Sequence, residues 1–145
     1  MTETPSVGVL MFVAYRAMEQ QIYAEVVAAG FEATLPQARL FARISEQGLR
    51  LTDLAESAQV TKQTAAYLVE QLESLGYVER VPHPTDARAR LVRLAPRGRE
   101  TQALASSIEA RIEREWQAHL GAAEWARLHA SLIRLREITD PYLGS

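Results

Sequence analysis

Apolar residues recur at helical spacing along the first third of the chain. Over residues 7–29 they follow steps of three and four, and the first two turns are apolar on nearly every side. This pattern predicts a helix that ends at Gly30 and is covered on more than one side. A second helix is predicted over about residues 35–47, with Pro36 in its first turn and Gly48 as its stop.

The next pattern predicts two short helices joined by a tight turn. Thr52 is placed to cap a helix that ends near Ala58, and Thr61 is placed to cap the following one, which Gly76 would end. The buried stripe of this second helix would be Ala65, Leu68, Val69, Leu72 and Leu75. Two short helices in this arrangement are the skeleton of a helix-turn-helix.

Residues 77–81 and 89–94 alternate apolar and polar side chains, which is the period of a strand. The turn-rich segment between them makes the pair a predicted hairpin, and a hairpin in this place is a wing. Helical periodicity then returns, with one helix over about 96–120, a break at Gly121 and a last helix carrying an apolar stripe to Ile138.

The predicted fold class is mainly α with a small β-hairpin wing. A winged helix-turn-helix (35–99) is flanked by N- and C-terminal helices (1–34 and 100–145) within a single domain of 145 residues. These flanking helices carry more apolar surface than one small winged domain needs. A helical interface in a homodimer would bury it.

Composition and charge narrow the function. The chain has no cysteine, which excludes disulfides and thiolate metal sites, and no apolar run approaches the ~20 residues of a membrane span, so we expect a cytoplasmic protein. Although the net charge is -2, residues 80–99 hold six arginines and one acid. Such a local positive field suits a polyanion partner, and double-stranded DNA is the one we expect.

The order and spacing of these features resemble the MarR (multiple antibiotic resistance regulator) family of winged-helix transcription factors. The resemblance covers nearly the whole chain, and it is carried by "LVEQLESLGYVER" and by Asp86-Ala87-Arg88 followed after five residues by Leu94-Ala95. The sequence departs from the family's pattern at Gln63, where proline or serine is common, and at two further positions. Ala95 stands where threonine is usual, so a helix cap is lost, and Tyr67 stands where many members place arginine, which alters the expected DNA preference.

The predicted DNA contacts lie on the second short helix and on the hairpin. A wing tip is thin enough for a minor groove of about 6 Å, where arginine is favoured, so we expect Arg88 to insert there. Four further arginines are expected to contact phosphates, namely Arg90, Arg93, Arg97 and Arg99. The resemblance implies that Asp86 fixes the tip by pairing with a nearby arginine, such as Arg90. On the helix we expect contacts from Thr61, Lys62, Gln63, Thr64, Ala66 and Tyr67, near the end that a helix-turn-helix turns toward bases. Alternatively, Tyr67 packs beneath the wing.

The resemblance also implies release of DNA by a small aromatic or anionic effector. Candidate pocket residues are Phe12, Tyr15, Arg16, Phe41 and Trp116, although a core or interface role is the more common one for each of them. The function expected is a ligand-responsive homodimeric repressor that binds a pseudo-palindromic operator. The alternative is a winged helix that binds proteins and reads no DNA sequence.

Enzymatic chemistry is not expected. The histidines His83, His119 and His129 form no metal-ligand spacing, the glycines form no phosphate loop, and no serine stands in a nucleophile elbow. We therefore expect no cofactor and no metal, and surface or packing roles for the histidines.

Overall fold

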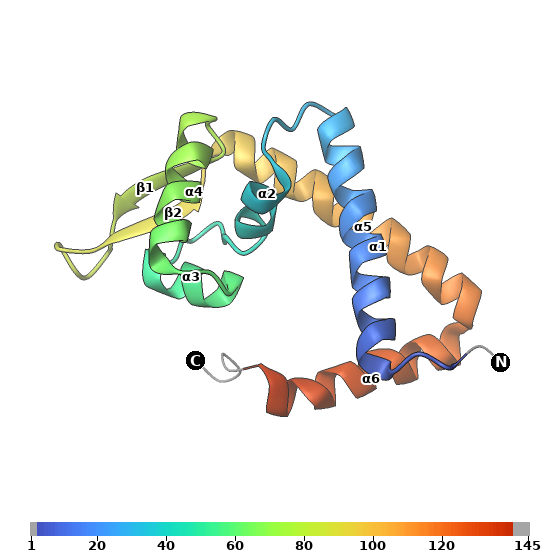
Figure 1. Ribbon diagram of the computed structural model, residues 1–145. Coiled ribbons are helices and arrows are strands. Elements are labelled where there is room, and N and C mark those ends of the chain that lie inside the picture. The colour runs from blue at the N-terminus through green and yellow to red at the C-terminus, as the bar shows by residue number, and fades with distance from the viewer. Residues whose placement is uncertain (1–2, 141–145) are drawn as a thin grey trace. The chain divides into compact units, whose positions relative to one another are not determined.

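The structure is a computed structural model that describes residues 3–140, which form six helices and a two-stranded antiparallel sheet (Figure 1). The chain divides into two compact units, Met1–Ser106 and Ser107–Ser145. The elements in chain order are α1 (Val7–Ala28), α2 (Leu35–Phe41), α3 (Leu51–Ala58), α4 (Lys62–Ser74), β1 (Val78–Pro82), β2 (Arg90–Leu94), α5 (Pro96–Leu120) and α6 (Ala122–Thr139). The predicted fold class is confirmed.

Helix α1 begins and ends as its sequence predicts. The Ser6 hydroxyl accepts a hydrogen bond from the amide of Val9 at 3.3 Å, which caps the first turn, and Gly30 follows the helix with φ +111°. Among the residues of α1, all of which are described, only Val26 is buried. The apolar first turns are therefore exposed within the first unit.

Helix α2 ends at Phe41, so the prediction that it continues to about residue 47 is wrong. The chain leaves the helical path because two distant segments bind it. Ile44 is buried, and its carbonyl oxygen accepts a hydrogen bond from Gln102 Nε2 at 2.9 Å. Leu49 then pairs with Val92 through two backbone hydrogen bonds of 3.0 and 2.9 Å. Tertiary contacts override the local helical pattern here.

Helices α3 and α4 form the predicted helix-turn-helix. The cap of α3 is Arg50, without a side-chain hydrogen bond, so the prediction that Thr52 caps this helix is wrong. Gln59 ends α3 in the left-handed conformation (φ +57°), which turns the chain sharply toward α4. The stripe of α4 is buried as predicted over Ala65, Leu68, Val69 and Leu72, while Leu75 is half-buried.

The hairpin is confirmed, and its strands begin one residue later than predicted. β1 and β2 pair antiparallel from Val78 with Leu94 to Pro82 with Arg90. Val92 and Leu94 are buried while Arg90 at the far end of β2 is exposed, so the strand has a core end and a solvent end. In Figure 1 the turn between the strands extends beyond α3 and α4.

The hairpin and the start of α5 meet at a tightly packed aromatic cluster. The ring centroids of Phe31, Phe41 and Tyr77 lie 4.7 to 6.0 Å apart. Gly98 in the first turn of α5 lies so close to Tyr77 that a Cβ atom at this position would be 2.0 Å from the Tyr77 carbonyl oxygen. The Arg97 guanidinium covers the Tyr77 ring at 4.4 Å.

In the second unit, Ile108 and Ile112 of α5 are buried, whereas α6 has no buried residue. Gly121 separates the two helices with φ +90°, as predicted. The apolar stripe of α6 is exposed over Leu128, Leu132, Ile133, Leu135 and Ile138. Among residues 3–140, no helix is both long and apolar enough to cross a membrane.

Candidate nucleic-acid interface

The first turn of α4 presents its amides and polar side chains to solvent. Thr61 caps the helix as predicted, since its hydroxyl oxygen accepts from the Thr64 amide at 3.0 Å. The same hydroxyl donates to Thr64 Oγ1 at 2.9 Å. Lys62 and Gln63 are exposed beside this cap. The helix end therefore offers hydrogen-bond donors and one cation on an open surface.

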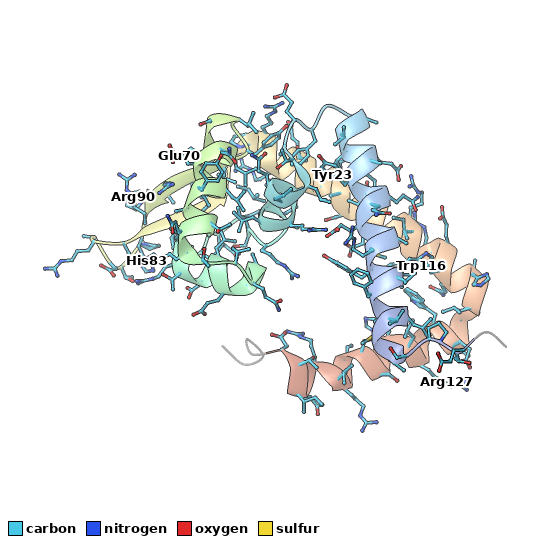
Figure 2. The ribbon with its side chains drawn as sticks, in the orientation of Figure 1. Tyr23, Glu70, His83, Arg90, Trp116 and Arg127 are labelled. Atoms are coloured by element: carbon cyan, nitrogen blue, oxygen red, sulfur yellow. The ribbon has the colours of Figure 1, made fainter. Side chains whose placement is uncertain are left out.

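Tyr67 lies one turn further along the exposed side of α4. Its side chain is 61% exposed, so the alternative in which it packs beneath the wing is wrong. The hydroxyl accepts a hydrogen bond from Gln71 Nε2 at 2.9 Å. Ala66 beside it is half-buried. Figure 2 labels Glu70, which lies further along the same helix.

His83 organises the turn of the hairpin. Its ring nitrogen Nδ1 accepts hydrogen bonds from the amides of Thr85 and Asp86, each at 3.1 Å. The backbone amide of His83 donates to Ala89 across the turn at 3.0 Å. Because Nδ1 acts as an acceptor, the neutral ring carries its proton on Nε2. This histidine thus has a local structural role at the wing tip (Figure 2).

Asp86 ties the wing tip to the helix-turn-helix. One carboxylate oxygen accepts from the Arg88 amide at 3.1 Å, and the other lies 3.3 Å from Nη2 of Arg50, the residue that precedes α3. The arginine that pairs with Asp86 is therefore Arg50, and the suggested pairing with Arg90 is wrong. Arg50 has no sequence signal beyond its charge, since it lies 36 residues from its partner.

Three arginines of β2 and α5 are engaged within the protein. Arg93 Nε donates to Glu79 Oε1 on the facing strand at 2.7 Å. Arg97 Nη1 donates to the carbonyl oxygen of Leu75 at the end of α4 at 2.6 Å. Arg99 Nη1 donates to the carbonyl oxygen of Leu94 at 3.3 Å. These contacts occupy three of the four arginines that we expected to reach phosphates.

The remaining arginines of this region differ in their surroundings. Arg80 Nε lies 3.8 Å from Glu73 Oε1 and is partly covered. In contrast, the side chains of Arg88 and Arg90 form no hydrogen bond or ion pair with any residue of the described range 3–140. Both are exposed, and Figure 2 shows Arg90 extending outward from the hairpin. Among the arginines of residues 80–99, Arg88 and Arg90 are therefore the two that are available to a partner.

The effector candidates do not form one cluster in the first unit. The Arg16 guanidinium lies 5.6 Å from the centre of the Phe12 ring, and Tyr15 is exposed on the same helix. Phe41 instead packs in the aromatic cluster of the core. Trp116 belongs to the second unit and is half-buried.

A charged cluster joins α1 to α2. Arg39 Nε and Nη2 donate to the two carboxylate oxygens of Glu19 at 3.1 and 2.8 Å, and the Tyr15 hydroxyl donates to the same carboxylate at 3.1 Å. Hydrogen bonding from Arg39 lowers the pKa of Glu19 below its ordinary value. Burial and the neighbouring Glu19 charge raise the pKa of Tyr15.

We expect Glu19→Gln to lower the free energy of unfolding by about 1 kcal/mol at neutral pH, because it removes a bidentate charged pair that is partly open to solvent. The lowered pKa makes this stabilisation complete above the ordinary value of 4.5 and progressively lost as the pH falls below it. Urea unfolding of both proteins at pH 7 and pH 3 measures the difference. The same difference at both pH values would contradict this assignment.

Metal binding has no visible basis in the described structure. No group of three His, Asp or Glu side chains among residues 3–140 is arranged to hold a metal ion. His119 lies near the end of α5 and His129 lies on α6, both exposed.

Comparison with known proteins identifies the family. Residues 33–89 match the model of the MarR family. The transcriptional regulator HosA of Escherichia coli O111:H- is 31% identical over 104 residues, which are 71% of this chain and 76% of HosA.

Solved structures agree in fold. Rv1404 of Mycobacterium tuberculosis has a TM-score of 0.70 at 24% identity, over 97% of this chain and 99% of that one. The M. tuberculosis MarR family protein Rv2887, solved with salicylic acid, has a TM-score of 0.66 at 24% identity over 93% and 99% of the two chains. Because the helix-turn-helix matches the family model and HosA is similar over most of its length, this chain belongs to the MarR family of transcriptional regulators.

Proposed function

We propose that this chain is a cytoplasmic, homodimeric repressor that binds a pseudo-palindromic DNA operator and releases it when a small effector binds. Each subunit would place α4 in a major groove and its wing in the flanking minor groove. The observation that carries this proposal is the contrast among the arginines. Arg93, Arg97 and Arg99 are engaged within the protein, while Arg88 and Arg90 are left exposed on the hairpin.

The two parts of the surface would have different tasks. Arg88 would enter the minor groove, whose negative potential favours arginine, and Arg90 would neutralise phosphate. The hydroxyls of Thr61 and Thr64, helped by the free amides of the first turn of α4, would position this helix on the DNA backbone. Gln63 and Lys62 would then contact base edges in the major groove, with Ala66 and Tyr67 beside them.

The dimer is proposed from exposed apolar surface in each unit separately. α1 exposes Val7, Val9, Leu10, Phe12 and Val13, and α6 exposes an apolar stripe over most of its length. Large apolar patches of this kind mark interaction surfaces in folded proteins. A second copy of the chain would cover them, with residues 1–34 and 100–145 as the dimerisation regions. Two-fold symmetry would then present two α4 helices about one DNA turn apart.

The dimer would have two conformations that differ in the spacing of its two DNA-binding surfaces. An effector would act by binding one of these conformations more tightly than the other. The complex of Rv2887 with salicylic acid supports a small aromatic or anionic molecule as its chemical class. Phe12 and Tyr15 are exposed and Arg16 beside them is half-buried, 3.6 Å from Glu19, so this part of α1 offers aromatic rings and a cation for such a ligand. Phe41 packs in the aromatic cluster of the core, so it would contact an effector only after a rearrangement of that cluster, and Trp116 is the candidate of the second unit.

The test is selection from a random duplex pool, followed by salt-titrated affinities for the selected sequence and a scrambled control. We expect a palindrome bound about a thousandfold or more above the control, with affinity falling steeply as salt rises. Failure to enrich any sequence, together with weak binding at physiological salt, would favour a winged helix that binds proteins instead.

A further inference from the structure

A chain of hydrogen bonds runs from the start of α2 to the exposed face of α4. The Thr34 amide donates to Gln37 Oε1 at 2.9 Å, and Gln37 Nε2 donates to Gln71 Oε1 at 2.6 Å. Gln71 Nε2 then donates to the Tyr67 hydroxyl at 2.9 Å. Gln37 is 7% exposed and also belongs to the capping box of α2, so the chain starts from a side chain with little freedom to turn.

The first bond determines the direction of all the others. A backbone amide can only donate, so Gln37 must present its oxygen to Thr34 and its NH₂ group to Gln71. Gln71 must therefore present its oxygen to Gln37, which leaves its NH₂ group for Tyr67. The Tyr67 oxygen is an acceptor in this arrangement, and its hydrogen is directed to a partner outside the chain of bonds.

We propose that Gln37 and Gln71 are positioning residues that hold Tyr67 as an outward hydrogen-bond donor to DNA, an inference that rests on the proposed function. The group that Tyr67 recognises is an acceptor, either a base-edge atom such as thymine O4, guanine O6 or purine N7, or a phosphate oxygen. The amino groups of adenine and cytosine are themselves donors and are disfavoured at this position. The open position of Tyr67 on α4 gives such a partner access.

Gln71→Glu tests the direction of the last bond. A carboxylate still accepts from Gln37, but it also accepts from Tyr67, so the hydroxyl hydrogen is withdrawn from the DNA. On the operator selected by the unmodified protein, we expect Tyr67→Phe to weaken binding about tenfold. Gln71→Glu should cost about tenfold in the original protein and at most about threefold in the Tyr67→Phe background, where only its charge acts.

Equal losses from Gln71→Glu in the two backgrounds would overturn the proposal, and so would an unchanged affinity for Tyr67→Phe. Gln37→Met is a second test variant, and it introduces no charge. Thermal unfolding is measured for every variant as a control for stability. Gln37→Met should weaken binding in the original protein and have no effect in the Tyr67→Phe background, whereas a purely structural role would give the same loss in both.

Repeating the DNA selection with the Tyr67→Phe variant shows whether the acceptor is a base-edge atom or a phosphate oxygen. A changed preference at one operator position means a base edge, and an unchanged preference with a uniform loss means phosphate. Either result supports the donor role. If the unmodified protein selects no sequence, the proposed function fails and this inference fails with it. If a palindrome is selected but the losses of affinity in the double variants are additive, this inference fails and the proposed function stands.

Discussion

Replacing Gly98 with alanine is expected to lower the free energy of unfolding by about 3 kcal/mol, the largest stability effect that we predict. The added Cβ atom would lie 2.0 Å from the carbonyl oxygen of Tyr77, which is far inside van der Waals contact. The obstacle is a backbone atom that also accepts the Ala95 amide at 3.0 Å, so it cannot turn away as a side chain would. Relief requires α5 to move away from the start of the hairpin.

Gly8→Ala is the matched control because Gly8 also lies in a helix. A Cβ atom there meets only the Ser6 hydroxyl oxygen, at 3.9 Å. Alanine should stabilise this position by up to about 1 kcal/mol, since it restricts the unfolded chain. Chemical unfolding monitored by circular dichroism measures both variants. If Gly98→Ala also stabilises the protein, the close packing of α5 on Tyr77 is not maintained in solution.

Arg88→Ala is expected to weaken operator binding by about 1–3 kcal/mol, roughly 5- to 150-fold, the largest effect on DNA affinity that we predict. The guanidinium has no partner among residues 3–140, so its removal leaves the wing intact while removing the proposed minor-groove contact. The tip keeps its shape through Asp86 and His83, which bond to the backbone rather than to the Arg88 side chain. If Arg88 also neutralises phosphate, the salt slope falls by about one.

Arg93→Ala removes the same charge from the same hairpin and serves as the control. Its guanidinium is already bound to Glu79 at 2.7 Å, so we expect a loss of less than about threefold. Affinities are measured by fluorescence anisotropy on the selected operator at several salt concentrations. Equal losses for the two arginines would mean that only the overall charge of the hairpin matters, which contradicts insertion of Arg88.

The elements that were predicted correctly are those whose signals are local. Thr61 caps the helix that follows it, and Gly30, Gly76 and Gly121 stand at helix ends with positive φ. The exit from α2 was not predictable in this way. It depends on Gln102, 58 residues away, and on a bridge to β2, neither of which leaves a trace in the local pattern of residues 42–49.

The arginines show the same limit at the site. Glu79 faces Arg93 across the hairpin, so this pair follows once the register of the two strands is known. Arg97, in contrast, binds Leu75 across 22 residues and Glu32 across 65, and no spacing rule connects those positions. Sequence pattern found the positive segment, but only the tertiary structure separates its engaged arginines from its exposed ones.

Four residues of the site were missed for related reasons. Arg50 and Gln37 act through partners 36 and 34 residues away. Gln71 lies one helical turn from Tyr67. This spacing predicts that the two side chains are in contact, but it does not predict which of them donates the hydrogen bond. His83 had a signal, since a ring acceptor placed two and three residues before free amides suits a turn, but we expected only a surface or packing role for it.

Pro82 at the end of β1 has a consequence for association between molecules. The amides of His83 and Ala95 donate hydrogen bonds across the hairpin to the carbonyl oxygens of Ala89 and Tyr77. Because hydrogen-bonded positions alternate along an antiparallel pair of strands, the backbone of Pro82 faces away from β2. The outer side of β2 is already occupied at Val92 by Leu49. An ordinary residue at position 82 would present an amide on the open side of β1, where a strand of another molecule could add. Proline has no such amide, so it protects the wing from edge-to-edge aggregation at high protein concentration.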